Sequence, residues 1–139
     1  MSNSIFDKHL TLFGKALNLR SKRNTIIASN IANRETPGYR AKDLVFDKEL
    51  ENALYSDRPG PLKTTDSRHF DGINRSPLEL VTGRQINSFN PDPGMDGNTV
   101  NIEKEMSKLA ENKIMYDSLV QMTNYKFRLL KSAITEGGK

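Results

Sequence analysis

The sequence predicts a mainly α-helical protein in which two long terminal helices pack as an antiparallel, coiled-coil-like pair. Three observations predict this fold class. Apolar residues recur at helical spacing near both ends, proline and glycine crowd the middle, and only 35% of the 139 residues are hydrophobic, with no tryptophan. A chain of this composition has a thin core, so its terminal helices dominate its architecture. We expect at most a short β-hairpin in the region that joins them.

The most regular segment runs from Asn101 to Glu136. Its apolar side chains follow alternating steps of four and three residues, the period of a helix that lies against other helices. A second row joins from Met115 onward, so the C-terminal half has an apolar face too wide for one partner helix. The first apolar row contains Ile102, Met106, Leu109, Tyr116, Val120, Phe127, Leu130 and Ile134, and the second apolar row contains Met115, Leu119, Met122, Leu129 and Ala133.

Turn chemistry bounds this C-terminal helix. Asp96-Gly97-Asn98 precedes it, and either Thr99 or Asn101 can cap its first amides. Gly137-Gly138 ends it.

A second long helix is predicted from Ser4 to Asn33, and Leu12, Leu19 and Ile26 are its expected packing residues. The apolar pattern stops between Arg20 and Asn24. Two alternatives follow: this charged side turns inward to meet acidic groups, or it faces solvent.

The N-terminal helix ends in a turn motif. Pro37 moves the residue before it out of the helical region, and Pro37-Gly38 suits a type II turn with glycine at positive φ. Short amide side chains near a helix end bond to its unpaired carbonyls or to the turn itself. Generic helix termination explains the Pro-Gly pair but not two asparagines and a tyrosine at this spacing. The motif residues are Asn30, Asn33, Thr36, Pro37, Gly38 and Tyr39.

This motif, N-I-A-N-x-x-T-P-G-Y, resembles the N-terminal signature of the bacterial flagellar rod, hook and hook-associated proteins. Ala41 to Phe46 then resembles their A-x-D-x-x-F block, and Asp96 to Met106 resembles the D-G-N-x-V-x-x-x-x-E segment that opens their C-terminal helix. Asn101 stands where such sequences often have aspartate. The short middle of the chain makes it most similar to the proximal rod proteins. Two sister proteins carry both signatures, and the stretch from Thr64 to His69 favours one of them.

The resemblance implies a structural subunit of the proximal rod, which polymerises into a helical tube that transmits torque and encloses the export channel. Its implied partners are copies of itself, neighbouring rod subunits, the adaptor FliE between the rod and the MS ring or export gate, and the flagellar type III export apparatus. It implies neither nucleic-acid binding nor membrane insertion. Charged residues interrupt Met1 to Lys15, so we expect export to the periplasm without a cleaved signal peptide.

Three regions are predicted: the N-terminal helix and turn motif (1–39), an extended and irregular middle (40–98) and the C-terminal helix (99–139), with both ends in one helical domain. Residues 56–97 hold five of the six prolines. Two short runs there, Leu62–Thr65 and Leu78–Thr82, either pair as a small hairpin or lie along a helix.

The sequence contains no arrangement that predicts catalysis, and we expect no enzyme activity, cofactor or metal site. The net charge of +4 comes from the N-terminal part, which has eight Lys or Arg against three Asp or Glu up to Val45. This excess allows one alternative function, a soluble helical-hairpin adaptor for an acidic or membrane partner. The wide apolar faces favour the structural protein, because they call for several helical neighbours.

Overall fold

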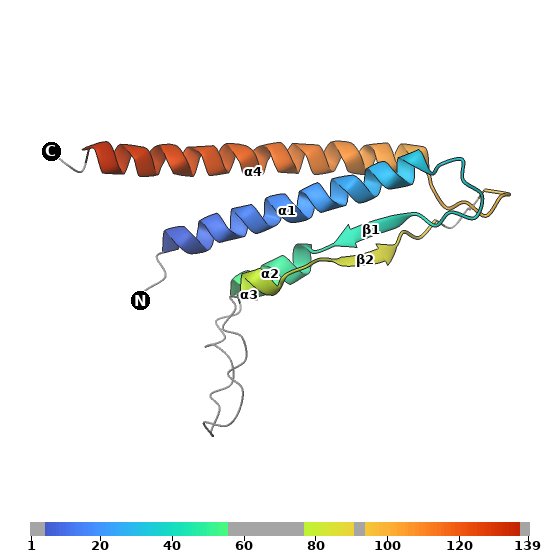
Figure 1. Cartoon of the computed structure of the whole chain (residues 1–139), viewed down its shortest axis with the longest axis horizontal. Helices are drawn as coiled ribbons and strands as arrows, with labels where there is room; N and C mark the ends of the chain where they lie inside the picture. The colour runs from blue at the N-terminus through green and yellow to red at the C-terminus, as the bar shows by residue number, and fades with distance from the viewer. Residues whose placement is uncertain (1–4, 56–76, 91–93, 137–139) are drawn as a thin grey trace, which may run out of the picture.

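The computed structural model describes residues 5–55, 77–90 and 94–136. In chain order the elements are α1 (Ile5–Ala32), β1 (Lys42–Val45), α2 (Asp47–Tyr55), α3 (Pro77–Leu80), β2 (Arg84–Asn87) and α4 (Ile102–Glu136). Figure 1 shows α1 and α4 side by side, with α1 between α4 and the β1–β2 ribbon. The predicted mainly helical fold with long terminal helices is confirmed. None of the described helices is long and apolar enough to span a membrane.

Local chemistry explains where α4 begins. The Asn101 side-chain oxygen accepts the Lys104 amide at 2.9 Å, so Asn101 is the cap, and Glu103 and Glu105 stand in the first turn at the positive end of the helix dipole. Thr99, the alternative cap, instead accepts the amide of Ala41. The predicted stop at Gly137-Gly138 lies outside the described residues.

The small sheet joins segments that are far apart in the chain. β1 pairs antiparallel with β2, and Lys42 lies opposite Asn87 and Val45 opposite Arg84. The strands are therefore not a local hairpin. Leu78–Thr82 is not extended as the sequence suggested, because Pro77 opens the short helix α3, where its fixed φ suits the first helical position. The other expected run, Leu62–Thr65, lies outside the described residues.

Helix α2 corrects the prediction that residues 40–98 are extended and irregular. Asp47 and Glu49 place negative charge in its first turn, and Leu50, Ala53 and Leu54 recur at helical spacing. The prolines that argue against helix in the middle region begin only at position 59. Residues 47–55 therefore had a helical pattern of their own.

The apolar core lies between α1 and the unit formed by β1, α2 and α3. Leu12, Leu19 and Ile26 of α1 all contribute to it, with Leu19 buried and the other two half-buried. Their packing partners inside the chain are therefore the residues of the middle region. The other members are Leu44, Phe46, Ala53, Leu78 and Val81, with Leu50 and Leu54 packed against them.

The contact between α1 and α4 includes buried polar groups. The amide of Asn112 is buried, donates to the Arg20 carbonyl at 2.9 Å and accepts from the Arg20 guanidinium at 3.5 Å. Arg20 also lies 3.6 Å from Asp47, and Arg23 lies 3.0 Å from Asp43. Arg20 and Arg23 thus turn inward to acids of the same chain, whereas Lys22 and Asn24 are exposed.

We expect Phe46→Ala to destabilise the fold by about 3–5 kcal/mol, because Phe46 is fully buried and the small core cannot close around the cavity. Urea unfolding of the purified chain measures this change. Phe89→Ala is the matched control: that ring is 79% exposed, so its loss should change the free energy of unfolding by less than about 0.5 kcal/mol. Equal effects of the two substitutions would contradict the placement of the core.

Candidate functional site

The two sequence motifs meet at the end of the helix pair that lies away from both chain termini (Figure 1). Residues Thr36 to Tyr39 form the predicted turn: the Tyr39 amide donates to the Thr36 carbonyl at 3.2 Å, and Gly38 has a φ of 70°. The Gly38 amide then donates to the carbonyl of Asp96 at 3.0 Å. The turn after α1 is thereby fastened to the loop before α4.

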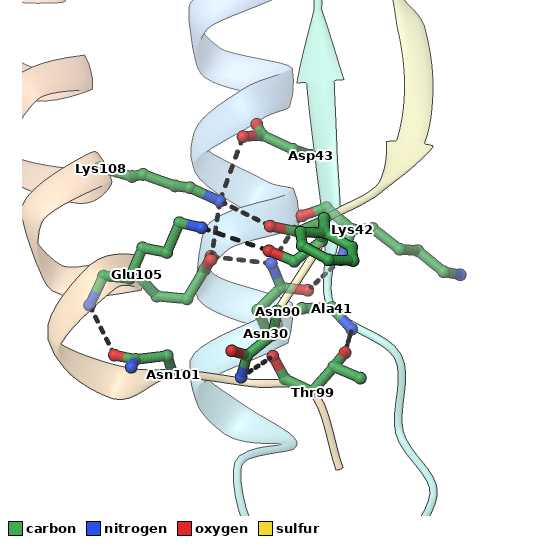
Figure 2. A network of polar contacts seen from close by, with 12 residues as sticks. Asn30, Ala41, Lys42, Asp43, Asn90, Thr99, Asn101, Glu105 and Lys108 are labelled. Atoms are coloured by element: carbon green, nitrogen blue, oxygen red, sulfur yellow. Dashed lines mark hydrogen bonds and ion pairs between the residues drawn. The ribbon is translucent and has the colours of Figure 1, made fainter. Parts of the chain in front are cut away.

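Two further hydrogen bonds continue this contact, one between backbone groups and one to a side chain. The Thr99 amide donates to the Tyr39 carbonyl at 3.0 Å, and the Ala41 amide donates to the Thr99 hydroxyl at 2.9 Å (Figure 2). We call the paired segments 30–46 and 96–108 the motif junction.

Asn98 caps helix α1 from the other end of the chain. Its buried side-chain amide nitrogen lies 3.0 Å from the carbonyls of Asn33 and Arg34 and 2.8 Å from that of Thr36. Its oxygen accepts the Val100 amide at 2.8 Å. A residue that the sequence analysis assigned only to a turn therefore holds the backbone that follows α1, and it adds a donor to the Asn33 and Thr36 carbonyls, which also accept backbone amides. The signal in the sequence was the side-chain amide of Asn98, because the backbone carbonyls that follow a helix accept hydrogen bonds from such a donor.

Asn30 is fully buried and joins three elements (Figure 2). Its nitrogen donates to the Lys42 carbonyl at 2.6 Å and to Glu105 at 2.8 Å, and its oxygen accepts the Lys42 amide at 3.0 Å. The Tyr39 hydroxyl donates to the same oxygen at 3.3 Å. Asn30 thus acts as a substitute strand partner for β1, a role that short-range helix-end chemistry did not reveal.

Asn33 and Thr36 keep to the local role that the sequence indicates. The Asn33 nitrogen donates to the carbonyl of Ser29 at 2.8 Å, and its oxygen accepts the Thr36 hydroxyl at 3.2 Å. Asn33 therefore bonds both to the helix end and to the turn.

Four charged residues form a balanced network beside Asn30. Glu105 is 1% exposed, and the Lys108 ammonium lies 2.9 Å from it and 3.2 Å from Asp43. Arg23 donates two hydrogen bonds to Asp43, at 3.0 and 3.3 Å. Two positive charges thus meet two negative ones, and every buried side-chain polar atom in the described residues has a partner. The network links α1, β1 and α4.

The network also sets the pKa of Asp43. Burial raises this pKa, but the hydrogen bonds and charges of Arg23 and Lys108 more than offset that effect and hold it below the ordinary value of 3.8. The ionised carboxylate is thus the form that the fold stabilises.

The first apolar row of α4 is mostly exposed in the single chain. Leu109, Val120 and Leu130 are half-buried, whereas the remaining members, Ile102, Met106, Tyr116, Phe127 and Ile134, are exposed. At about 100° per residue, the buried Glu105 and Asn112 that face α1 lie between the first and second apolar rows. Helix α1 therefore occupies the strip between the rows and leaves apolar surface on both of its sides.

The motif junction joins the turn after α1 to the loop before α4 through polar contacts. The polar groups of the junction are paired with one another, and no cluster of metal-ligating side chains occurs among the residues that the structure describes. Terminal helices joined through these two motifs define an axial protein of the flagellar type.

Comparison with known proteins identifies the branch of this class. Residues 14–40 match the family model "Flagella basal body rod protein". The chain is similar to the flagellar basal body rod protein FlgB of Aeromonas hydrophila, with 38% identity over 93% of this chain and 94% of the relative. It is 35% identical to FlgB of Cereibacter sphaeroides over 93% and 95%, and 30% identical to FlgB of Escherichia coli K12 over 94% and 96%.

The chain belongs to the FlgB family of flagellar basal body rod proteins. It is accordingly a structural subunit of the proximal rod, located in the basal body, and its family assembles with other rod proteins. Of the two sister proteins that share both signatures, FlgB and FlgC, these relatives are FlgB.

We expect Asn98→Asp to destabilise the fold by about 2–4 kcal/mol, because a carboxylate would face three carbonyl oxygens without a donor. Chemical denaturation at neutral pH measures the loss. Asn101→Asp is the matched control, since aspartate caps a helix as well as asparagine does. A similar loss in both variants would show that the Asn98 amide is not required as a donor.

The lowered pKa of Asp43 makes its contribution pH-dependent. Its stabilisation is present above the unfolded value, near 3.8, and is lost as the pH falls through the lower value of the folded state. Asp43→Asn should therefore lower the free energy of unfolding above that range, and the gap from the unchanged chain should narrow below it. Denaturant titrations across pH 3.8 measure the gap. A gap that stays constant on acidification would contradict the ion pairs.

Proposed function

We propose that the chain polymerises into the helical tube of the proximal rod, which transmits torque and encloses the export channel. The observation that carries this proposal is the exposure of apolar side chains on both sides of the strip where α1 meets α4. Phe127 and Ile134 of the first apolar row are 54% and 77% exposed, and Met115 and Met122 of the second are 46% and 53% exposed. An adaptor with one partner would need one such surface, whereas a subunit in a tube has neighbours on both sides.

We further propose that α1 and α4 act in the rod as an antiparallel pair that completes its coiled-coil-like packing with helices of neighbouring subunits. Asn30 contacts Glu105, while Arg20, earlier in α1, contacts Asn112, later in α4. This order of contacts supports opposite helix directions. On this proposal, residues 1–39 and 99–139 form one helical domain, and the first apolar row packs between subunits.

The partners and the route of the subunit belong to the same proposal. The part of the rod that this chain forms contacts FliE and other rod proteins at its two ends. The subunit reaches the rod through the flagellar type III export apparatus, and it has no catalytic role of its own. Mass spectrometry of purified basal bodies tests the route, because the peptide from residues 1–15 should still be present. Loss of that peptide would indicate a cleaved signal.

Electron cryomicroscopy of the assembled basal body tests the proposal directly. We expect density for α1 and α4 in the wall of the rod next to the MS ring, with both apolar rows covered by neighbouring subunits. Rods that lack this chain, or a subunit with either row facing solvent, would contradict the proposal.

The motif junction gives this proposal a genetic test. Gly38 has a φ of 70° and open space where a Cβ would stand, so Gly38→Val strains only the backbone, by about 1–3 kcal/mol. The strain changes the angle of α1 in every subunit, so the variant should be exported yet fail to form rods.

Lys42→Ala is the matched control for Gly38→Val, because the Lys42 side chain is exposed and only its backbone bonds to Asn30. Rod yield and swimming motility are the measurements. Normal rods in the Gly38→Val strain would contradict the proposal that this turn sets the angle of α1, and would leave it as an ordinary helix end.

A further inference from the structure

A groove lies between α1, α2 and α4, beside the second apolar row. It has a volume of about 200 Å³, and its walls include Phe46 and Leu50 from one side and Met115, Leu119 and Met122 from the other. Methionine side chains adapt to the shape of an incoming partner. The groove is therefore an apolar surface beside the core that can receive side chains of another molecule.

The charges at this groove come from α1 and α2. Arg20 and Asp47 both line it and lie 3.6 Å apart, so they offset one another. Glu51 lies one turn further along α2, is exposed and adds a negative charge beside that pair. An occupant with apolar side chains flanked by positive charge would fit both the walls and the edge.

The C-terminal half of the first apolar row has this chemistry. Phe127 is 54% exposed, and it lines one shallow depression together with Arg128 and Lys131. Both basic residues are exposed. Two copies that met through this row alone would bring like charges together, which costs free energy. Charge complementarity therefore favours contact between the row of one copy and the groove of another.

We infer that the groove between α1, α2 and α4 receives the C-terminal half of the first apolar row of α4 from a second copy of this chain. This inference rests on the proposed function and names the surfaces through which like subunits meet. The two surfaces differ, so the contact is heterologous, and it extends from copy to copy instead of closing as a dimer. Lys131 of one copy lies near Glu51 of the next.

The chain contains no cysteine, so single-cysteine variants report contacts cleanly. We propose to express Glu51→Cys and Lys131→Cys chains together and to treat the assembled basal bodies with a short bis-maleimide linker. The expected product is a dimer that joins one chain of each type, identified by mass spectrometry of its linked peptides. Each variant expressed alone should give no dimer. Ser107→Cys, exposed on another part of α4, should give none with Glu51→Cys.

Charge exchange provides the second measurement. Lys131→Glu should lower the amount of this chain in purified basal bodies by about tenfold, and the added substitution Glu51→Lys should restore it. Restoration distinguishes a contact between these residues from a folding defect. Unchanged incorporation of Lys131→Glu would overturn the inference.

The crosslinking results separate this inference from the proposed function. If both variants enter the rod but link only to themselves, only to another rod protein or not at all, the inference is wrong and the rod assignment stands. If the unchanged chain is absent from purified rods, the proposed function itself fails.

Discussion

The side-chain amide of Asn98 donates to three backbone carbonyls in the turn that follows α1, those of Asn33, Arg34 and Thr36. Most of the architecture depends on this interaction, because it fixes the loop before α4 against the turn after α1. The backbone bonds of Gly38 and Thr99 and the placement of Asn30 against β1 all lie beside it. Asn98 and the carbonyls that it contacts are 62 to 65 positions apart, so this interaction connects distant parts of the chain.

The apolar core and the charged network hold different elements in place. Apolar packing holds α1 to the middle region, whereas Glu105, Lys108 and Asn112 give α4 buried polar contacts with α1 and β1. Buried ionic and polar contacts contribute less net stability than apolar packing, but they tolerate few alternative registers. The position of α4 along α1 is therefore specified by polar pairing. Much of the apolar surface of α4, including Phe127 and Ile134, is exposed in the single chain.

The elements that local sequence determines were predicted. The two helices and the positive φ of Gly38 follow from spacing, side-chain chemistry and steric limits within a few residues. The sequence left two candidate caps for α4, Thr99 and Asn101, and the structure selects Asn101. The roles of Asn98 and Asn30 could not be predicted, because their partners are brought close only by the fold. The pairing of β1 with β2 was missed for the same reason, and α2 was missed because it borders a region rich in proline.

The junction also bears on when the chain can fold. Asn30 and Glu105 are 75 positions apart, and the partners of Asn98 are 62 to 65 positions away. Contacts of such separation form late, since the entropy of closing the intervening loop is lost before they contribute. The separation of the two motifs along the chain therefore delays the formation of the junction until both ends of the chain are present.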